Sequence, residues 1–508
     1  MTGPRRHAPV ICVALGLERR ALRGAHTAVL RVGMGPRRAA RSFRASGSLG
    51  GRPVIVAGVG GGIGPDVRPG DVVVATEVRG PNGDVRRCPS APLLAAELRR
   101  HGLVVHLGPI ASARRVAGQA ARRALAASGV LAVDTESAWL APSPRHPEDR
   151  AATTPFAVVR VIVDTEREPL LRPATARRGL RALRRLAGTV PALDAWAAAV
   201  GPREVVLANP RSFCAGVDRA IEVVDRALDR FGAPVYVRRQ IVHNTHVVRD
   251  LERRGAVFVD EVDRVPPGSV LVFAAHGVSP AVRAAAEARD LRVVDATCPL
   301  VTKVHTEVRR HSARDATVFL IGHADHEEVE GTVGEAPADV VVVEDVASAA
   351  RVQPRDAANV AYATQTTLAV DEATEIADVL RARFPAIAAP KSDDICYATT
   401  NRQRAVRDIA PGCDLVLVVG SPNSSNSLRL VEVAQREGVP ARLVDQAADV
   451  DLRTLTGTRR IGITAGASAP PALVDELVDC LGGLGPLSVE EPATDPEILR
   501  FTLPKEVS

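Results

Sequence analysis

Short apolar runs alternate with segments of helical periodicity along the first 200 residues. The apolar runs are Val10–Leu15, Val54–Val59, Val72–Ala75, Val104–Leu107 and Val158–Val163. Runs of this length suit buried strands, and apolar residues three or four positions apart suit the helices between them. The pattern therefore predicts an α/β domain in this part of the chain.

The pattern restarts after Gly201-Pro202. A strand is expected from Val205, followed by a helix with apolar positions that include Val217, Ile221 and Val224 on one face. A chain of 508 residues is also longer than the roughly 250–300 residues that one hydrophobic core usually serves. We therefore predict two domains, residues 1–200 and residues 201–508.

Three cysteines of the second domain share one local pattern. Cys298 lies between a strand-like run that ends at Val294 and a helix-like run that begins at Val301, and Cys214 and Cys396 have similar neighbours. The three are separated by 84 and 98 residues, about the length of a small α/β unit. The sequence therefore predicts three similar α/β units, each of which presents a cysteine from a strand-to-helix turn toward a common centre.

A cysteine at the start of a helix is favoured as a thiolate, because the first-turn N–H groups and the helix dipole stabilise negative charge. One such cysteine alone is more often structural, but three thiolates indicate a metal or cluster site with one open position. Sulfur ligands alone favour an iron–sulfur cluster over catalytic zinc. The chain has seven cysteines and no CxxC pair, so we expect no disulfide framework, and we interpret Cys413 and Cys480 as core residues.

Polar residues follow the predicted strands of the second domain. Ligands bind at the carboxyl ends of strands in open α/β sheets. Histidines, hydroxyl groups and helix-start N–H groups suit an anion with many oxygens, such as a diphosphate. These turns include His243, His276, His326, Thr366, Ser424, Ser425, Asn426 and Ser468.

Charge differs strongly between the two predicted domains. Residues 1–200 contain 31 arginines, no lysine and 14 acidic residues, a net charge of +17, whereas the remainder carries −11. This difference indicates two modules of separate origin. The arginines are dispersed along helices with no aromatic residues between them, which favours a solvated face over a nucleic-acid partner.

No apolar run reaches the roughly 18 residues of a membrane span. The opening Met-Thr-Gly-Pro-Arg-Arg precedes an apolar run, Val10–Leu15, that is too short for a secretory signal. We therefore expect a cytoplasmic protein without a membrane span.

Glycines and carboxylates mark the first domain. The glycine-rich segment Gly58–Asp66 is expected to form a turn after a strand, but neither GxGxxG before a clear helix nor GxxxxGK[ST] is present. Glu136 in Val-Asp-Thr-Glu-Ser and Asp164 in Val-Arg-Val-Ile-Val-Asp resemble motifs of the nucleoside phosphorylase and methylthioadenosine/adenosylhomocysteine nucleosidase superfamily. Thr135 and Val163 depart from its usual Met and Ser, and Glu18 is an uncertain match to its first acidic residue.

This resemblance implies that Glu136 binds a ribose and Asp164 protonates a departing purine. The domain then either cleaves or phosphorolyses an N-glycosidic bond, binds a nucleoside without turnover, or serves only for docking.

The second domain resembles the 4-hydroxy-3-methylbut-2-enyl diphosphate reductases from about residue 204 to the carboxyl end. The segments that carry the resemblance include LANPRSFCAGVDRAI, DATCPLVTKVH, GHADHEEVEGT, DDICYATTNRQ and GSPNSSNSLRL. The resemblance implies an α/β fold of three similar small units around a central [4Fe–4S] cluster, one per chain, held by Cys214, Cys298 and Cys396. Asp325 and Glu327 stand where Gly and Pro are expected in many members.

The resemblance also implies a reaction. (E)-4-hydroxy-3-methylbut-2-enyl diphosphate would lose its hydroxyl reductively to give isopentenyl and dimethylallyl diphosphate, the last step of the methylerythritol phosphate route. Glu328 would deliver protons together with Thr366, and ferredoxin or flavodoxin would supply the electrons. The diphosphate would be bound by His243, His276, His326, Thr366, Ser424, Ser425, Asn426 and Ser468. The rival hypothesis is a cluster-containing sensor without turnover, which would have no need of the proton donor Glu328.

Overall fold

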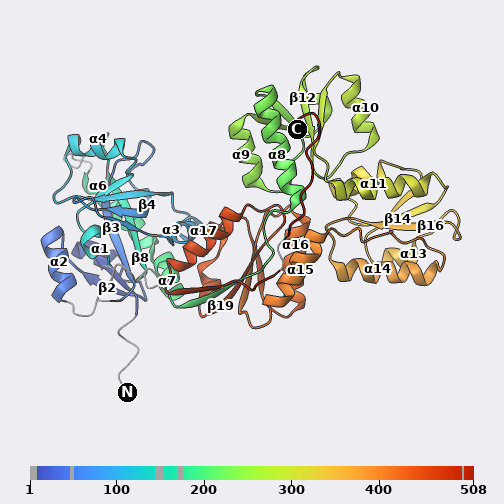
Figure 1. Cartoon of the computed structure of the whole chain (residues 1–508). Coiled ribbons are helices and arrows are strands. Elements are labelled where there is room, and N and C mark those ends of the chain that lie inside the picture. The colour runs from blue at the N-terminus through green and yellow to red at the C-terminus, as the bar shows by residue number, and fades with distance from the viewer. Residues whose placement is uncertain (1–7, 46–50, 143–153, 169–174, 495–496) are drawn as a thin grey trace. The chain divides into compact units, whose positions relative to one another are not determined.

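The computed structural model describes residues 8–45, 51–142, 154–168, 175–494 and 497–508, so the opening residues 1–7 lie outside the described part. The chain divides into two compact units, each built of strands and helices (Figure 1). The first contains Met1–Val205, Gln446–Ile461 and Asp475–Glu490. The second contains Val206–Asp445, Gly462–Val474 and Glu491–Ser508. No helix in the described ranges is long and apolar enough to cross a membrane.

The first unit is built on an eight-stranded sheet of order β2-β1-β3-β7-β6-β4-β5, in which β8 pairs with both β3 and β4. The predicted α/β character of this part is confirmed. Its strands are β1 (Val10–Val13), β2 (Ala28–Arg31), β3 (Val54–Gly62), β4 (Val72–Arg79), β5 (Val85–Arg87), β6 (Val105–Ser112), β7 (Ala132–Asp134) and β8 (Phe156–Asp164). Its helices are α1 (Gly16–Ala21), α2 (Pro36–Ala45), α3 (Ala91–Arg100), α4 (Gln119–Ala127), α5 (Ser137–Leu140), α6 (Thr175–Gly188) and α7 (Val190–Ala199).

The predicted glycine-rich turn over residues 58–66 is confirmed only for its last part, Gly64–Asp66. The prediction is wrong for Gly58–Gly62, which form the second half of strand β3. Buried charged side chains pass directly over them. A Cβ atom on Gly58 would lie 2.6 Å from Glu18 Oε1, and one on Gly61 would lie 2.6 Å from Arg122 Nη2. The glycines therefore make room within the sheet for a buried charge network.

The second part of the chain forms three further sheets, and the prediction of three α/β units is confirmed. Their orders are β11-β10-β12-β13, β15-β14-β16 and β18-β17-β19-β9-β20. The strands are β9 (Arg203–Leu207), β10 (Val235–Arg238), β11 (Ala256–Val259), β12 (Val270–Phe273), β13 (Arg292–Asp295), β14 (Thr317–Ile321), β15 (Val340–Val343), β16 (Val360–Thr364), β17 (Leu415–Val419), β18 (Ala441–Val444), β19 (Arg460–Ala465) and β20 (Leu487–Glu490).

The helices that accompany these sheets begin after their strands. They are α8 (Ala215–Phe231), α9 (Thr245–Arg254), α10 (Pro280–Ala288), α11 (Pro299–Ser312), α12 (Glu327–Val333), α13 (Val346–Arg351), α14 (Val370–Arg383), α15 (Tyr397–Ile409), α16 (Ser425–Arg436) and α17 (Pro471–Gly482). Short 3₁₀ turns cover Val262–Arg264, Ala447–Asp449 and Leu452–Leu455.

Alternation along a strand explains how helices cover both faces of a sheet. In β14, Val318 and Leu320 pack with Val304 and Val308 of α11, whereas Phe319 and its like-facing neighbours pack with α14. Successive side chains of a strand point to opposite faces, so a strand that is apolar at every position must be covered on both sides. Figure 1 shows β14 and β16 between α11 and the pair α13 and α14.

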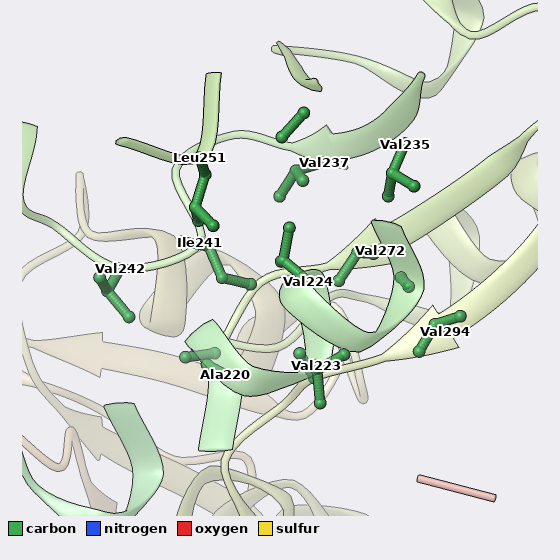
Figure 2. Packing of buried hydrophobic residues seen from close by; sticks show 14 of the residues in the cluster. Ala220, Val223, Val224, Val235, Val237, Ile241, Val242, Leu251, Val272 and Val294 are labelled. Atoms are coloured by element: carbon green, nitrogen blue, oxygen red, sulfur yellow. The ribbon is translucent and has the colours of Figure 1, made fainter. Parts of the chain in front are cut away.

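The sheet around β10 has a well-packed core. Figure 2 shows Val224 of α8 beside Val237 of β10 and Val272 of β12, with Val223 one residue earlier on the same helix. All four side chains are fully buried. Their removal from water stabilises the unit that presents the first residues of the site, because each buried aliphatic side chain contributes roughly 1.5–3 kcal/mol.

Substitution of one of these side chains should weaken the unit locally. Val237→Ala should lower the free energy of opening of β10 by about 2 kcal/mol, because it leaves a cavity in the cluster. Hydrogen exchange of the peptide that spans Val235–Arg238 should then accelerate about thirtyfold. The control is Val257→Ala in the neighbouring strand, where the side chain is 39% exposed and the cost should stay below about 0.5 kcal/mol. Equal effects at the two positions would contradict the assigned role of the cluster.

Candidate active site

Each of the three cysteines is the residue that immediately precedes a helix. Cys214 caps α8, Cys298 caps α11 and Cys396 caps α15, each with an extended backbone. The predicted position at a helix start is therefore confirmed for all three. Cys214 and Cys298 also follow strands, β9 and β13, as expected. The expected strand before Cys396 is absent among the described residues, since an irregular segment with a single β-bridge at Ala388 takes its place.

The three thiols converge on one cavity of about 100 Å³. Gly216 keeps the space between two of them open. A Cβ atom at this position would lie 2.8 Å from the Cys298 Sγ and 3.8 Å from the Cys214 Sγ. The cavity is lined by all twelve residues that the sequence assigns to this site: Cys214, Cys298, Cys396, His243, His276, His326, Glu328, Thr366, Ser424, Ser425, Asn426 and Ser468.

Burial makes these thiols difficult to ionise in the absence of a positive charge. It raises the pKa of Cys298 to about 12, and the neighbouring Cys214 and Cys396 add to the rise. Burial raises the pKa of Cys396 to about 11 and also raises that of Cys214. First-turn N–H groups oppose the rise at each sulfur, but more weakly. Three thiolates are therefore stable here only with bound cationic charge.

Three histidines line the cavity as a compact group. The rings of His243 and His276 are stacked with centroids 4.0 Å apart. The ring of His326 stands at an angle to both, 5.5 Å from His243 and 6.0 Å from His276. The residues come from the segments after β10, β12 and β14, as the sequence predicts.

The histidines are neutral and have nitrogens available for a ligand. Burial lowers the pKa of His243 to about 2, and it lowers those of His276 and His326 to about 4. His326 Nδ1 accepts the backbone N–H of Glu328 at 3.1 Å, so its proton resides on Nε2. This Nε2 atom has no hydrogen-bond partner among the described residues, and neither do the Nδ1 atoms of His243 and His276.

Glu327 lies beside this group, where the resemblance leads to an expectation of proline. Its Oε2 atom is 3.4 Å from His276 Nδ1. His243, His276 and Glu327 offer ligand atoms within 4.8 Å of one another, which is close enough for one metal ion. The surrounding hydroxyl and amide donors suit an oxygen-rich anion better, because such an anion accepts hydrogen bonds from each of them.

Glu328 is a buried carboxyl group held by a single partner residue. The backbone N–H of Thr366 donates to Oε1 at 2.7 Å, and the Thr366 hydroxyl donates to Oε2 at 2.9 Å. Burial raises the pKa of Glu328 to about 7, although both hydrogen bonds favour the ionised form. The group can therefore hold or release a proton near neutral pH, as a general acid requires.

The serines and the asparagine belong to one hydrogen-bonded group at the start of α16. Ser468 donates to the backbone carbonyl of His243 at 3.0 Å, and its hydroxyl lies 3.4 Å from that of Ser424. Asn426 accepts the N–H of Ala467 at 3.0 Å. The Thr367 hydroxyl donates to Ser425 at 3.2 Å. These bonds fix the side chains before a ligand arrives.

Two contacts of the cysteines were missed by the sequence analysis. The backbone N–H of Thr399 lies 3.3 Å from Cys396 Sγ, and its hydroxyl is 3.1 Å from the same sulfur. Asn426 Nδ2 donates to this hydroxyl at 3.2 Å. The position three residues after a cap residue is a general signal for such a bond. The Tyr397 hydroxyl accepts the N–H of Ala215, a contact that no local pattern indicates.

Cys413 and Cys480, the two cysteines interpreted above as core residues, do not line this cavity. Cys480 is buried in α17, as predicted. Cys413 is only half-buried. It lies in the segment between α15 and β17, packs against the cluster around β17 and donates its S–H to the Ile409 carbonyl at 3.1 Å.

The two candidates of the first unit are both buried and both paired with arginine. Glu136 Oε2 lies 3.3 Å from Arg160 Nη2, and Oε1 accepts the N–H of Gly35 at 3.1 Å. Asp164 Oδ2 accepts from Arg122 Nη2 at 2.5 Å. Burial raises the pKa of Asp164, and Arg122 opposes the rise.

Glu18, which the sequence left uncertain, is also buried close to Arg160. Its Oε1 accepts the N–H of Val59 at 2.8 Å. Burial raises its pKa, and Arg160 opposes the rise. Asp134, which lies at the end of β7, binds the same arginine with Arg160 Nη2 2.7 Å from its Oδ2. Arg160 therefore compensates several carboxylates of this unit at once.

Known proteins resemble the two parts of the chain separately. The Phosphorylase superfamily profile matches residues 17–190, and the LytB protein profile matches residues 205–482. A 4-hydroxy-3-methylbut-2-enyl diphosphate reductase of Xanthomonas campestris pv. campestris is 57% identical over 309 residues, which cover 60% of this chain and 98% of that protein. A 4-hydroxy-3-methylbut-2-enyl diphosphate reductase 2 of Mycobacterium bovis is 56% identical over 313 residues, covering 61% and 95%.

A solved structure resembles the same region. The E-1-hydroxy-2-methyl-but-2-enyl-4-diphosphate reductase of Plasmodium falciparum superposes with a TM-score of 0.58 and 39% identity, covering 60% of this chain and 97% of that one. The LytB profile matches more than half of the chain, and the curated relatives are matched over nearly their whole length. The chain therefore belongs to the LytB protein family.

Proposed function

We propose that the second domain, residues 201–508, reduces (E)-4-hydroxy-3-methylbut-2-enyl diphosphate to isopentenyl and dimethylallyl diphosphate. The observation that carries this proposal is the single cavity shared by three thiols, three neutral histidines and a carboxyl group with a pKa of about 7. The reaction consumes two electrons and two protons, breaks the C–O bond of the allylic alcohol and releases water. Close relatives bear the name of this reductase.

The donor set of the cavity fits one [4Fe–4S] cluster per chain. Cys214, Cys298 and Cys396 would hold three of its irons, and Gly216 leaves the space between two sulfurs open. A ligand set of three sulfurs, with no histidine or carboxylate ligand, favours an iron–sulfur cluster over a zinc ion. When bound, the cluster supplies the two electrons and a Lewis-acidic iron for the substrate oxygen. Ferredoxin or flavodoxin would deliver electrons from outside.

The diphosphate would lie against the polar side of the cavity. His243 Nδ1 and His326 Nε2 have no partner among the described residues, and His276 Nδ1 has only Glu327 Oε2 at 3.4 Å. A ligand in the cavity would satisfy these nitrogens, and leaving them without hydrogen bonds is unfavourable. Ser424, Asn426 and Ser468 are held in place by the bonds described above and would add further contacts. An anion bound there would raise the pKa values of the histidines, and protonation of the histidines would in turn strengthen the binding of the anion.

Glu328 would provide the proton that leaves with the substrate hydroxyl. Thr366 orients both carboxyl oxygens, and burial keeps a large fraction protonated near neutral pH. A sensor without turnover would have no use for a buried acid tuned in this way. The Glu328–Thr366 pair therefore favours the enzyme over the rival hypothesis.

We propose that the first domain, residues 1–200, binds a nucleoside and hydrolyses its glycosidic bond. Glu136 would contact the ribose, and Asp164 would protonate the purine. Arg122 must move away from Asp164 for this step, because an ion-paired carboxylate is a poor proton donor. Nucleoside binding without turnover and a docking role remain the alternatives.

Cys298→Ser should remove the cluster. The purified, anaerobically reconstituted variant should lose most of its iron, sulfide and visible absorbance, because an alcohol is a far weaker iron ligand than a thiolate. Cys413→Ala serves as the control, since that cysteine lies outside the cavity. An intact cluster in the Cys298 variant would refute the three-sulfur site.

Glu328→Gln should keep the cluster and bind the substrate but lower kcat by about 10²-fold or more. The protonated carboxyl group is the active form, so kcat/KM of the wild type should fall as the pH rises through about 7. This descending limb should be missing from the residual activity of the variant. Rates measured with a chemical reductant at pH 5.5–8.5 test both points, and unchanged turnover in the variant would exclude the assigned role.

The glycosidase proposal predicts adenine release. The full chain should liberate adenine from 5′-methylthioadenosine or S-adenosylhomocysteine, and Asp164→Asn should slow the release about 100-fold. Asp71→Asn, which alters a carboxylate hydrogen-bonded to His106, is the control. If the wild type releases no adenine, the proposed hydrolysis of these two nucleosides is refuted. A calorimetric binding measurement would then distinguish nucleoside binding without turnover from a docking role.

A further inference from the structure

A cation on the helix of the first cysteine reaches the segment of the second. Arg219 stands on α8, five residues after Cys214. Its Nη1 atom donates to the backbone carbonyls of Ala296 and Thr297, at 3.1 Å each. These are the two residues that precede Cys298.

The same arrangement recurs from the second cysteine to the third. Lys303 stands on α11, five residues after Cys298. Its Nζ atom donates to the carbonyls of Ser392 and Asp393, at 2.8 and 2.9 Å. It also lies 3.0 Å from Asp394 Oδ1. This segment leads directly into Cys396.

A third cation returns from the last cysteine to the first. Arg402 stands on α15, six residues after Cys396, and its side chain is fully buried. Nε and Nη2 donate to the carbonyl of Ser212, at 3.0 and 2.6 Å, and Nη2 also donates to that of Phe213 at 3.0 Å. These two residues precede Cys214. The three links close a ring that passes through all three cysteine segments.

The order of the elements explains the ring. The helix that begins at each cysteine packs on the sheet that the chain then builds: α8 on β10 and β12, α11 on β14, and α15 on β17. Each of these sheets ends in, or lies beside, the segment that carries another cysteine. A long cationic side chain one or two turns into the helix therefore lies beside that segment's carbonyl groups. In all three units a cation stands five or six residues after the cysteine and binds backbone carbonyl groups. This repetition distinguishes the three links from incidental surface pairs.

We propose that Arg219, Lys303 and Arg402 are positioning residues for the cluster, a role that rests on the cysteine site proposed above. By binding the backbone just before each cysteine, they fix the separations of the three sulfurs. As three positive charges around a cavity that gains negative charge on reduction, they also stabilise the reduced cluster and raise its midpoint potential. Glu497 lies 3.2 Å from Arg402, and Asp394 lies 3.0 Å from Lys303, so each carboxylate offsets part of the positive charge, and removal of the cation leaves that carboxylate unpaired. Arg402 acts most strongly, because its burial leaves the least water to screen its charge.

The test compares variants that remove the charge with variants that retain it. Arg402→Met and Lys303→Met should lose iron to a chelator about tenfold faster than the wild type, in line with other partners of metal ligands. Both should have a midpoint potential more negative than that of the wild type, as followed by electron paramagnetic resonance in a redox titration. Arg219→Lys and Lys303→Arg keep the charge, so they should lose iron faster than the wild type and yet retain its potential.

A neighbouring arginine provides the matched control. Arg404 lies on the same helix as Arg402 but is exposed, so Arg404→Met should leave both the rate of iron loss and the potential unchanged. Wild-type chelation rates and potentials in the Met variants would overturn the ring proposal while leaving the cluster in place. A wild-type protein that binds no cluster after reconstitution would instead overturn the proposed function on which the ring rests.

Discussion

The electrostatics of three sulfur atoms in one buried cavity constrain the rest of the second unit. Burial and mutual repulsion raise the pKa values of these thiols, so that they ionise together only around bound positive charge. The surrounding structure lowers that cost in two ways. A helix begins at each cysteine and directs its first N–H groups toward the sulfur. The positive charge of Arg402, which binds the carbonyl groups just before Cys214, lowers the pKa of that thiol.

The opposite wall of the cavity is neutral, and this neutrality is useful for binding an anion. Burial keeps the three histidines uncharged, and protonated rings 4.0 to 6.0 Å apart would also repel one another, so they remain neutral until a ligand compensates them. Glu328 is also kept neutral by burial, although its charged form is negative. It has no cation within hydrogen-bonding distance among the described residues, so it retains a proton near neutral pH. A diphosphate that enters such a site meets hydrogen-bond donors and an acid, and no arginine or lysine is among the described residues that line the cavity.

The fold and most of the site could be predicted, because they follow local rules. Cys298 could be placed at a helix start from its apolar neighbours alone, and the strands around Val56 and Val318 follow from short apolar runs. The errors occur where tertiary contacts override local signals. Gly58 belongs to a strand because it pairs with β8, and it is a glycine because Glu18 and Arg160 occupy the space that a side chain would need. The carbonyl contacts of Arg402 span nearly two hundred residues of sequence, and an arginine in a helix has the same local appearance whether it is exposed or buried.

Two buried carboxyl groups show why a motif alone does not determine chemistry. Glu328 and Asp164 both end a recognisable pattern, and burial raises the pKa of each. Glu328 accepts hydrogen bonds from Thr366, a neutral residue, and its pKa reaches about 7. Asp164 accepts from Arg122, whose charge favours the ionised form. The first is therefore ready to donate a proton in the structure as it stands. The second can do so only after Arg122 is displaced, so binding of a nucleoside at the proposed site would itself control the acid.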